Sequence, residues 1–363
     1  MSTGKIRVLL ADDSALMRRE LKRLIDGDPR LEVVAIARDG VEAVEGTKAA
    51  DPDVVALDIN MPRMDGLTAL QHIMAEAPHP VVMVSSLTQK GALAAYEALE
   101  LGAVDFVGKP DGTVSKLLSQ ITFDLRTKLC NASVANRANL VRVSRTTRPT
   151  RPAKKERGTQ PRTAPAVRAS GLGKIVVIGQ STGGPATITD IISKFPADLG
   201  VPVVIVQHMP GTFTPSFAQR LSANCNLPFC EVKTGQLIEC GRGYLAPGDF
   251  HLALGSRPGD RGFLAHVSTN PREAQYVPSV DVTMESVLSR YGSKTIAVLL
   301  TGMGDDGARA MAAIRASGGH TIAESEETAI VFGMPKAAIE LGGAEFILPA
   351  YAIGSKIVAL VRN

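Results

Sequence analysis

The sequence contains no tryptophan, and aromatic residues make up only 4% of its 363 residues. Alanine, valine, isoleucine and leucine supply most of the 45% hydrophobic content, as expected for buried parallel strands alternating with helices. No run approaches the roughly 18 apolar residues of a membrane span, and the N-terminus has no signal-peptide core. We therefore expect a globular, cytoplasmic α/β protein without membrane insertion.

Several ligand motifs are also missing. The cysteines have neither C-x-x-C spacing nor a histidine partner at zinc-finger distance, so we expect reduced thiols at Cys130, Cys225, Cys230 and Cys240. The dinucleotide fingerprint G-x-G-x-x-G is absent, because Ser181 stands where the second glycine would be. Gly-rich turns that open helices do bind phosphates, so a nucleotide site is only disfavoured.

Arginine and proline gather between residues 131 and 172, where the apolar periodicity fades. Such a basic segment cannot bury enough apolar surface to offset its ordering entropy. It is either a solvated spacer or a dock for an acidic partner or nucleic acid, and charge runs favour the spacer. We expect a first domain over residues 1–128, a linker over residues 129–172 and a second domain over residues 173–363.

The first domain alternates apolar runs with amphipathic segments. The runs predicted as strands are Ile6–Leu10, Leu31–Ala37, Val54–Leu57, Pro80–Val84 and Ala103–Val107. Five strands with crossover helices make a doubly wound parallel sheet, whose ligand site lies at the carboxyl ends of the strands.

Polar residues follow four of these runs. Asp12 and Asp13 follow the first, Asp58 the third, Ser85 the fourth and Lys109 the fifth. Three carboxylates in one pocket repel one another unless a cation lies among them, and an all-oxygen set suits Mg²⁺. Asp58 then serves as a nucleophile that accepts a phosphoryl group, with Lys109 holding its oxygens and Ser85 moving toward the new charge. Each carboxylate alone could simply cap a helix.

This first domain closely resembles the flavodoxin-like receiver domains of two-component response regulators. The resemblance implies phosphorylation of Asp58 by a histidine kinase, with Mg²⁺ as cofactor. It also implies a switch made of Ser85, Lys109 and the aromatic residue Phe106. Receivers precede many different effectors, so the function must come from the second domain.

The second domain carries the motif G-x-S-x-G, in which Ser181 follows the apolar run Ile175–Ile178. That motif is the nucleophile turn of serine hydrolases. Two more predicted strands, Val201–Val206 and Thr295–Leu300, end before the segments QHMP and TGMGDDG. If the three strands are parallel neighbours, Ser181, His208 and one of two aspartates converge at one sheet edge.

A serine hydroxyl needs a base to remove its proton and a carboxylate to orient that base. The chain order Ser, His, Asp differs from that of α/β-hydrolases, which indicates another fold. His251, His266 and His320 are rival bases, although none closes a strand within so distinctive a motif. A lone histidine at a strand end is also commonly structural, and the Gly-rich turn could be only a tight loop.

The segments IGQSTGGP, VQHMPGTFTPSFAQRL, YLAPGDFHL, PSVDVTMESV, LLTGMGDDGARAM and VFGMPKAA resemble the CheB family of chemotaxis methylesterases. The resemblance implies a parallel-sheet methylesterase domain with the catalytic triad Ser181, His208 and Asp306. It further implies Thr182 and Met303 at the oxyanion site or pocket. Gln180 departs from the usual small residue before the nucleophile.

By this resemblance the chain is a phosphorylation-activated hydrolase that takes part in chemotactic adaptation. It removes methyl groups from glutamate esters of methyl-accepting chemotaxis receptors, deamidates glutamines there and needs no cofactor for the esterase. We expect the receiver to cover the groove around Ser181 until Asp58 is phosphorylated. A DNA-binding regulator would have a compact helix-turn-helix instead of this α/β pattern. A non-catalytic receptor-binding module leaves the combined Ser, His and Asp unexplained.

Overall fold

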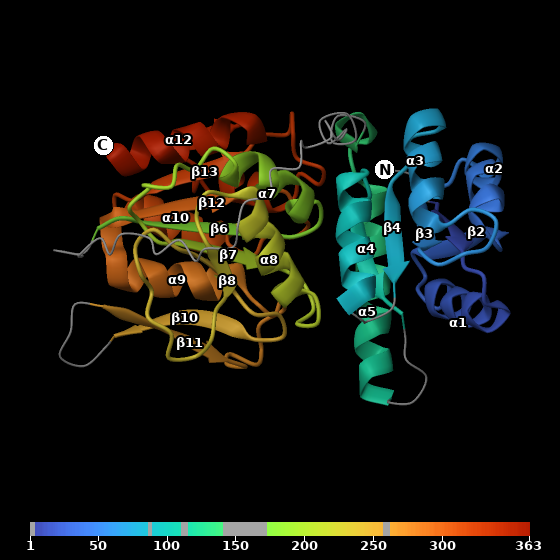
Figure 1. Ribbon diagram of the computed structural model, residues 1–363, viewed down its shortest axis with the longest axis horizontal. Helices are drawn as coiled ribbons and strands as arrows, with labels where there is room; N and C mark the ends of the chain where they lie inside the picture. Colours follow the sequence, from blue (N-terminus) through green and yellow to red (C-terminus); the bar gives the residue numbers. More distant parts are fainter. Residues whose placement is uncertain (1–3, 86–88, 110–114, 141–172, 257–261) are drawn as a thin grey trace, which may run out of the picture.

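The computed structural model of the protein describes residues 4–85, 89–109, 115–140, 173–256 and 262–363. Figure 1 shows two α/β units side by side, the N-terminal one in blue to green and the C-terminal one in yellow-green to red. Each unit is built on a parallel sheet, so the predicted fold class is confirmed. Among the described residues, no helix is both long and apolar enough to span a membrane.

The first sheet has five parallel strands in the order β2-β1-β3-β4-β5. These are β1 (Ile6–Ala11), β2 (Leu31–Ala37), β3 (Val54–Asp58), β4 (Val81–Ser85) and β5 (Asp105–Gly108). Strands β3, β4 and β5 are buried along their whole length, as apolar runs covered by helices on both faces should be. All five predicted strands are confirmed.

The crossover helices are α1 (Ala15–Asp26), α2 (Gly40–Ala50), α3 (Gly66–Glu76), α4 (Gln89–Glu100) and α5 (Ser115–Ser133). The first three begin at side-chain caps, where Ser14, Asp39 and Asp65 accept hydrogen bonds from free backbone N–H groups. Helix α5 continues past the expected domain end at residue 128, because Leu129 and Ala132 are buried along its apolar side. Residues 141–172 of the expected linker lie outside the described residues.

The second sheet has seven strands in the order β14-β13-β12-β6-β7-β9-β8, and all neighbouring pairs are parallel. They are β6 (Ile175–Gln180), β7 (Val203–Gln207), β8 (Phe229–Glu231), β9 (Gly243–Leu245), β12 (Thr295–Leu299), β13 (His320–Glu324) and β14 (Phe346–Leu348). The three strands predicted here correspond to β6, β7 and β12. Strands β10 (His251–Ser256) and β11 (Phe263–Ser268) form a separate antiparallel pair that the sequence analysis did not anticipate.

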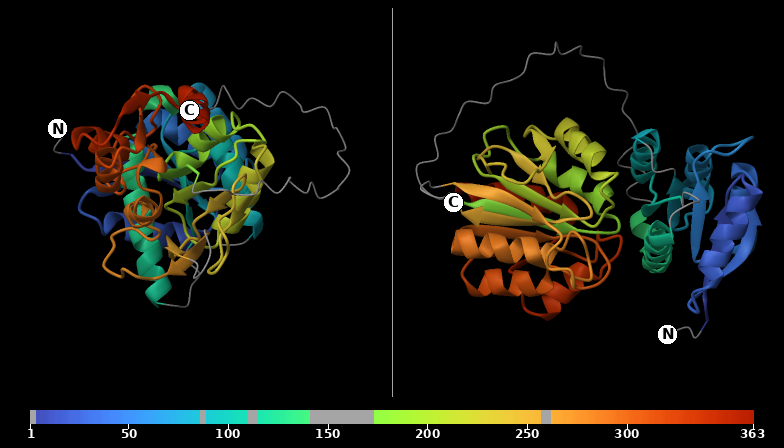
Figure 2. Two further views of the ribbon diagram at one scale, coloured as in Figure 1. Left: turned by 90° about the vertical axis from the view of Figure 1, so that its left-hand side faces the viewer. Right: turned by 90° about the horizontal axis from the view of Figure 1, so that it is seen from below.

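Helices cover both faces of this second sheet (Figure 2). One hydrophobic core contains side chains of α7 (Gly184–Ile192), α8 (Thr214–Asn224) and α12 (Ala350–Arg362). The other contains side chains of α9 (Val280–Tyr291), α10 (Ala308–Ala316) and α11 (Met334–Glu340). A short 3₁₀ helix, Gly292–Lys294, leads from α9 into β12. The sheet is thus buried between two apolar layers, which fixes the positions of its strand ends.

The two units pack against each other through aromatic side chains. The Tyr96 hydroxyl of α4 donates a hydrogen bond to the Phe213 carbonyl at 2.7 Å. The Phe106 ring lies 4.3 Å from the Phe213 ring, and the Tyr96 ring stacks on Phe217 at 5.6 Å. Arg220 of α8 pairs with Glu100 at the edge of this contact. The docking face of the first unit is therefore the one that carries α4 and β5.

Candidate active site

Ser181 lies in the sharp turn between β6 and α7. The turn passes through Gly183, whose φ of +82° is a conformation that favours glycine. A Cβ there would also come within 2.8 Å of the Ile330 Cβ. Gly302 packs against the nucleophile turn from the opposite side, since a Cβ on it would lie 2.8 Å from the Ser181 Cβ. The sequence thus builds a tight turn around a serine that retains 8% exposure.

Strands β12, β6 and β7 are adjacent and parallel, so their carboxyl ends meet at one edge. Two backbone hydrogen bonds continue the sheet beyond the strands. The Ser181 N–H donates to the Thr301 carbonyl at 3.0 Å, and the His208 N–H donates to the Gln180 carbonyl at 3.2 Å. The predicted convergence of the three strand ends is confirmed.

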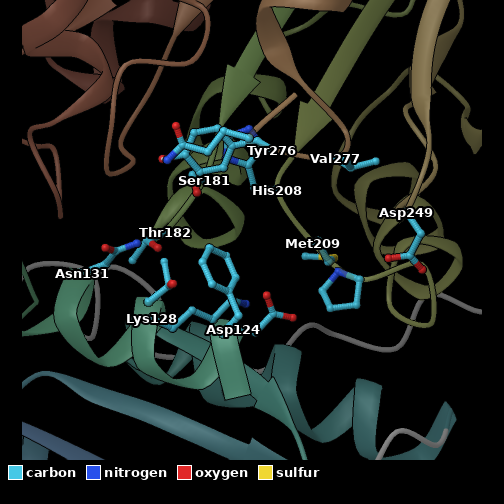
Figure 3. A pocket seen from close by; sticks show the side chains of 14 residues that line it. Asp124, Lys128, Asn131, Ser181, Thr182, His208, Met209, Asp249, Tyr276 and Val277 are labelled. Atoms are coloured by element: carbon cyan, nitrogen blue, oxygen red, sulfur yellow. The ribbon is translucent and has the colours of Figure 1, made fainter. Parts of the chain in front are cut away.

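His208 is oriented by a carboxylate and by an aromatic ring. Its Nε2 lies 2.8 Å from Asp306 Oδ2, while Nδ1 is buried without a hydrogen-bond partner among the described residues. The Tyr276 ring stacks on the imidazole with 4.6 Å between centroids and 2° between planes. Figure 3 shows Ser181, His208 and Tyr276 together on one side of a cavity. Nδ1 is therefore the ring nitrogen left to take part in proton transfer.

Asp306 is held by the first turn of α9. The backbone N–H groups of Val280 and Asp281 donate to its carboxylate at 2.7 and 3.0 Å. The hydroxyl of Ser279, which also caps α9, donates to Oδ1 at 2.9 Å. Burial alone would raise the pKa of Asp306, but the His208 and backbone hydrogen bonds lower it below the ordinary carboxyl value. The neighbouring Asp305 is exposed, so the structure separates the two aspartates that the motif left open.

The rival histidines lie elsewhere. His320 is the first residue of β13, so it lies at the amino ends of the parallel strands, and its Nδ1 lies 2.8 Å from Glu345 Oε2. His266 is exposed on the hairpin strand β11. His251 is buried and bonds the loop that leads into α9. None of the three bonds Asp306 in the described part of the chain.

Thr182 and Met303 occupy different environments. Thr182 is buried, and its hydroxyl donates to Asp105 Oδ2 of the first unit at 2.9 Å. The next N–H, that of Gly183, donates to the Val104 carbonyl of the first unit at 3.1 Å. Met303 is 39% exposed in the loop after β12. The first unit therefore occupies polar groups directly beside Ser181.

The cavity at Ser181 has a volume of about 260 Å³ and is lined by both units. One wall contains Ser181, His208 and Tyr276, and the facing wall contains Asp124, Lys128 and other residues of α5 (Figure 3). Lys128 also pairs with Asp105 at 2.9 Å. Burial, together with the negative charge of Asp105 and Asp249, raises the pKa of Asp124 despite the opposing effect of Lys128. The opening toward Ser181 is thus partly formed by the first unit.

A second polar site lies at the carboxyl edge of the first sheet. Carboxylate oxygens of Asp12, Asp13 and Asp58 lie within 4.8 Å of one another. Lys109 Nζ lies 2.9 Å from Asp12 and 2.7 Å from Asp58. Burial raises the pKa of Asp58, and the nearby Asp12 raises it further, although Lys109 opposes both effects. One ammonium facing three carboxylates leaves an excess of hard oxygen ligands, which fits Mg²⁺.

The predicted switch residues flank this second site. The Ser85 hydroxyl is buried and donates to the Gly91 carbonyl at 3.2 Å. Phe106 is also buried, with its ring 5.9 Å from Tyr96 and 4.3 Å from Phe213 of the second unit. The predicted switch and the domain contact thus share one aromatic side chain, Phe106.

Ser279 and Tyr276 were not predicted as site residues from the sequence, and His251 was predicted only as a rival base. Ser279 carried a signal, because a serine before an amphipathic run is a typical helix cap. Tyr276 lies in an irregular loop between the hairpin and α9, where no periodicity reports its position.

Two protein-family models match the chain, one described as a response regulator receiver domain over residues 8–122 and one as CheB methylesterase over residues 176–357. The chain is 49% identical over 363 residues to protein-glutamate methylesterase/protein-glutamine glutaminase 2 of Carboxydothermus hydrogenoformans, covering 99% of this chain and 100% of the relative. It is 44% identical over 361 residues to protein-glutamate methylesterase/protein-glutamine glutaminase of Thermotoga maritima, covering 99% and 100%. The crystal structure of the Thermotoga maritima CheB methylesterase catalytic domain matches 52% of this chain and 98% of that chain, with a TM-score of 0.50 and 45% identity.

Proposed function

The chain belongs to the CheB methylesterase family, with a response-regulator receiver ahead of the catalytic part, and from that premise we propose that it is a protein-glutamate methylesterase and glutaminase whose nucleophile is Ser181. Its substrates are glutamate methyl esters and glutamines of methyl-accepting chemotaxis receptors, and its reaction takes place in the cytoplasm. We assign residues 1–128 to the receiver, whose last helix α5 runs on to Ser133, the residues from there to 172 to the linker, and residues 173–363 to the catalytic domain. The observation that carries the proposal is the His208–Asp306 pair, 2.8 Å apart, at the same sheet edge as Ser181.

In the first half of the reaction Ser181 Oγ attacks the γ-carbonyl carbon of the substrate. His208 Nδ1 accepts the hydroxyl proton, while Asp306 stabilises the imidazolium through Nε2–H. The same proton then passes to the leaving group, which departs as methanol from an ester or as ammonia from an amide. Water resolves the acyl-enzyme by the reverse sequence, and the carboxylate product leaves.

Negative charge that develops on the carbonyl oxygen needs nearby donors. The backbone N–H groups that follow Ser181 at the start of α7 are the candidates, since a helix N-terminus favours negative charge. Thr182, next to Ser181 in the chain, and Met303, in the loop after β12, stay the candidate pocket residues on the family resemblance. Removal of one such donor typically costs about 3 to 4 kcal/mol of transition-state stabilisation in serine hydrolases.

The receiver supplies the regulation. Asp12, Asp13 and Asp58 would hold Mg²⁺, which, when bound, offsets their charge and that of an incoming phosphoryl group. Asp58 accepts the phosphoryl group from a histidine kinase, Lys109 binds its oxygens and Ser85 moves toward them. Phe106 follows Ser85, and its contact with Phe213 conveys the change to the domain interface.

Docking of the unphosphorylated receiver restrains the esterase. The Val104 carbonyl takes the Gly183 N–H, and Asp105 takes the Thr182 hydroxyl. Both groups would otherwise be available beside the nucleophile. Release of these two hydrogen bonds accompanies activation, so phosphorylation relieves a block rather than building a new site.

The decisive experiment measures methanol released from radiolabelled, methylated receptor. The wild type and Ser181→Ala are compared with and without a small-molecule phosphodonor and Mg²⁺. We expect release that requires Ser181 and rises with the phosphodonor. If the variant binds receptor and releases methanol like the wild type, Ser181 is not the nucleophile. If neither protein releases methanol although both bind receptor, the chain is a binding module.

A further inference from the structure

His251, the first residue of β10, is 1% exposed, yet both of its ring nitrogens have partners. Nδ1 accepts a hydrogen bond from the Ser279 backbone N–H at 3.1 Å. Nε2 lies 3.1 Å from the Pro271 carbonyl. Because a carbonyl can only accept, Nε2 carries the proton and the ring is the neutral tautomer. Burial lowers the pKa of His251, in keeping with this neutral form.

The two partners of His251 are the two ends of one loop. Pro271 begins the loop and Ser279 ends it, and the described chain between them has no helix or strand. A single buried ring therefore ties both ends of residues 271–279 to the hairpin strand β10. This link replaces the regular backbone hydrogen bonds that would fix a helix or strand.

That loop supplies two of the groups that surround His208 and Asp306. Tyr276, near its middle, stacks on the His208 imidazole. Ser279, at its end, donates its hydroxyl to Asp306 at 2.9 Å and begins the helix whose N–H groups hold that carboxylate. His251 thus bonds Ser279, which in turn bonds Asp306, and His251 itself does not contact the reacting atoms.

We propose that His251 is a positioning residue for the triad: it clamps residues 271–279 so that Tyr276 and Ser279 keep His208 and Asp306 in their reactive arrangement. This inference rests on the catalytic roles given above to Ser181, His208 and Asp306. The Nδ1 bond is the more important of the two, because it bears directly on Ser279. Small displacements of catalytic groups cost up to about 100-fold in rate.

Three substitutions separate the two bonds of the ring. His251→Asn keeps an acceptor near the position of Nδ1, His251→Gln keeps a donor near the position of Nε2, and His251→Phe keeps the ring volume with neither group. The full-length, phosphodonor-activated protein is assayed with methylated receptor. We expect kcat to fall by about 100-fold in His251→Phe, by less in His251→Gln and by the smallest factor in His251→Asn. KM should stay unchanged within about twofold in all three variants.

A second readout needs no receptor. A fluorophosphonate probe forms a bond to Ser181 Oγ and releases fluoride, and its rate depends on proton removal by His208. We expect the labelling rates to follow the order of kcat. His266→Asn, on the exposed part of the same hairpin, is the matched control and should label like the wild type.

The outcomes are distinguishable. If Ser181→Ala still releases methanol, the proposed function fails. If Ser181→Ala is inactive while His251→Phe and His251→Gln match the wild type in kcat and labelling rate, only the role of His251 is overturned. A rise in KM at unchanged kcat also overturns it. If His251→Phe does not fold, the comparison of His251→Asn with His251→Gln decides. A higher kcat in His251→Asn supports the positioning role of His251, and equal kcat values contradict it.

Discussion

His208 presents its two ring nitrogens to different surroundings, and this asymmetry sets the chemistry at the scale of single residues. Nε2 faces a carboxylate that three donors at the start of α9 already hold, and Nδ1 is buried without a hydrogen-bond partner in the described part of the chain. Because its pKa is lowered, Asp306 stays ionised wherever its unfolded counterpart does. If activity falls when the pH is lowered below neutrality, protonation of Asp306 is therefore not the cause.

Replacement of Asp306 with Asn tests this assignment. The amide preserves the shape of the side chain but not the negative charge that stabilises the imidazolium. We expect kcat for methanol release to fall by about 10⁴-fold, the scale of this change in other triads. The matched control is Asp305→Asn, next in the chain and exposed, which should keep the wild-type rate. Equal losses in both variants would remove Asp306 from its proposed role.

Single site residues could be predicted from the sequence only where they follow a recognisable strand. Ser181 and His208 each follow an apolar strand within a distinctive segment, so both could be predicted from the sequence alone. His251 and Tyr276 gave no such indication, because their contacts join an irregular loop to distant elements. Asp305 and Asp306 could not be separated by spacing, since burial decides between them and burial depends on the packing of α9.

At the scale of elements, both polar sites lie where parallel strands end. Strands β1, β3 and β5 bring Asp12, Asp58 and Lys109 to one edge of the first sheet. In the same way, β6, β7 and β12 bring Ser181, His208 and Asp306 to one edge of the second sheet. These strands were predictable because they are largely apolar runs covered on both faces, although β1 and β5 each include one charged residue, Arg7 and Asp105. The hairpin β10–β11, the short strands β8, β9 and β14, and strand β13 were not predicted. Three-residue strands and a half-exposed hairpin carry weak periodicity, and the sequence HTIAE of β13 has only two apolar residues.

The carboxylate edge of the first sheet predicts a pH-dependent response to Mg²⁺. A cation that binds only the folded state at about 100 times its Kd stabilises that state by about 2.7 kcal/mol. Because the pKa of Asp58 is raised, protons compete with the metal at a higher pH than for an ordinary carboxyl. We expect MgCl₂ to raise Tm at neutral pH, and the increase to shrink as the pH falls through this raised pKa.

Thermal unfolding with and without MgCl₂ measures this effect. Asp58→Asn should lose most of the increase in Tm at neutral pH. Asp65→Asn is the control, because Asp65 caps α3 outside the cluster and asparagine is an equally good cap. An increase in Tm that persists in Asp58→Asn would indicate that the metal binds elsewhere.

At the scale of the whole molecule, the contact between the units joins the two sites. Phe106, a residue of the proposed switch in the first unit, touches Phe213 of the second, while the Tyr96 hydroxyl donates to the Phe213 carbonyl. The expectation that the receiver covers the groove around Ser181 came from the family resemblance and the domain order. The particular groups that it occupies, Thr182 and Gly183, had no signal in the sequence.

Loss of the Tyr96 hydroxyl should loosen this contact without altering the esterase itself. Tyr96→Phe removes one of the two hydrogen bonds that the Phe213 carbonyl accepts, while the bond from the Phe217 N–H at 3.1 Å remains. The lost bond costs about 0.5 to 1.5 kcal/mol, and only while the domains are docked. We expect basal methanol release to rise by about two- to tenfold, with the phosphodonor-stimulated rate unchanged. Tyr351→Phe, an exposed tyrosine on α12, is the control. An unchanged basal rate in Tyr96→Phe would contradict restraint through this contact.

The shared wall of the cavity has a thermodynamic consequence. Because α5 of the receiver lines the space in front of Ser181, a receptor segment entering that space competes with the docked receiver for the same surface. Receptor binding and phosphorylation both disfavour the docked state, so each one favours the other, and this coupling is reciprocal. Under the proposed function, phosphorylation strengthens receptor binding, and a dense array of receptors in turn promotes phosphorylation of Asp58. The enzyme would then sense the crowding of its own substrate as well as the signal from its kinase.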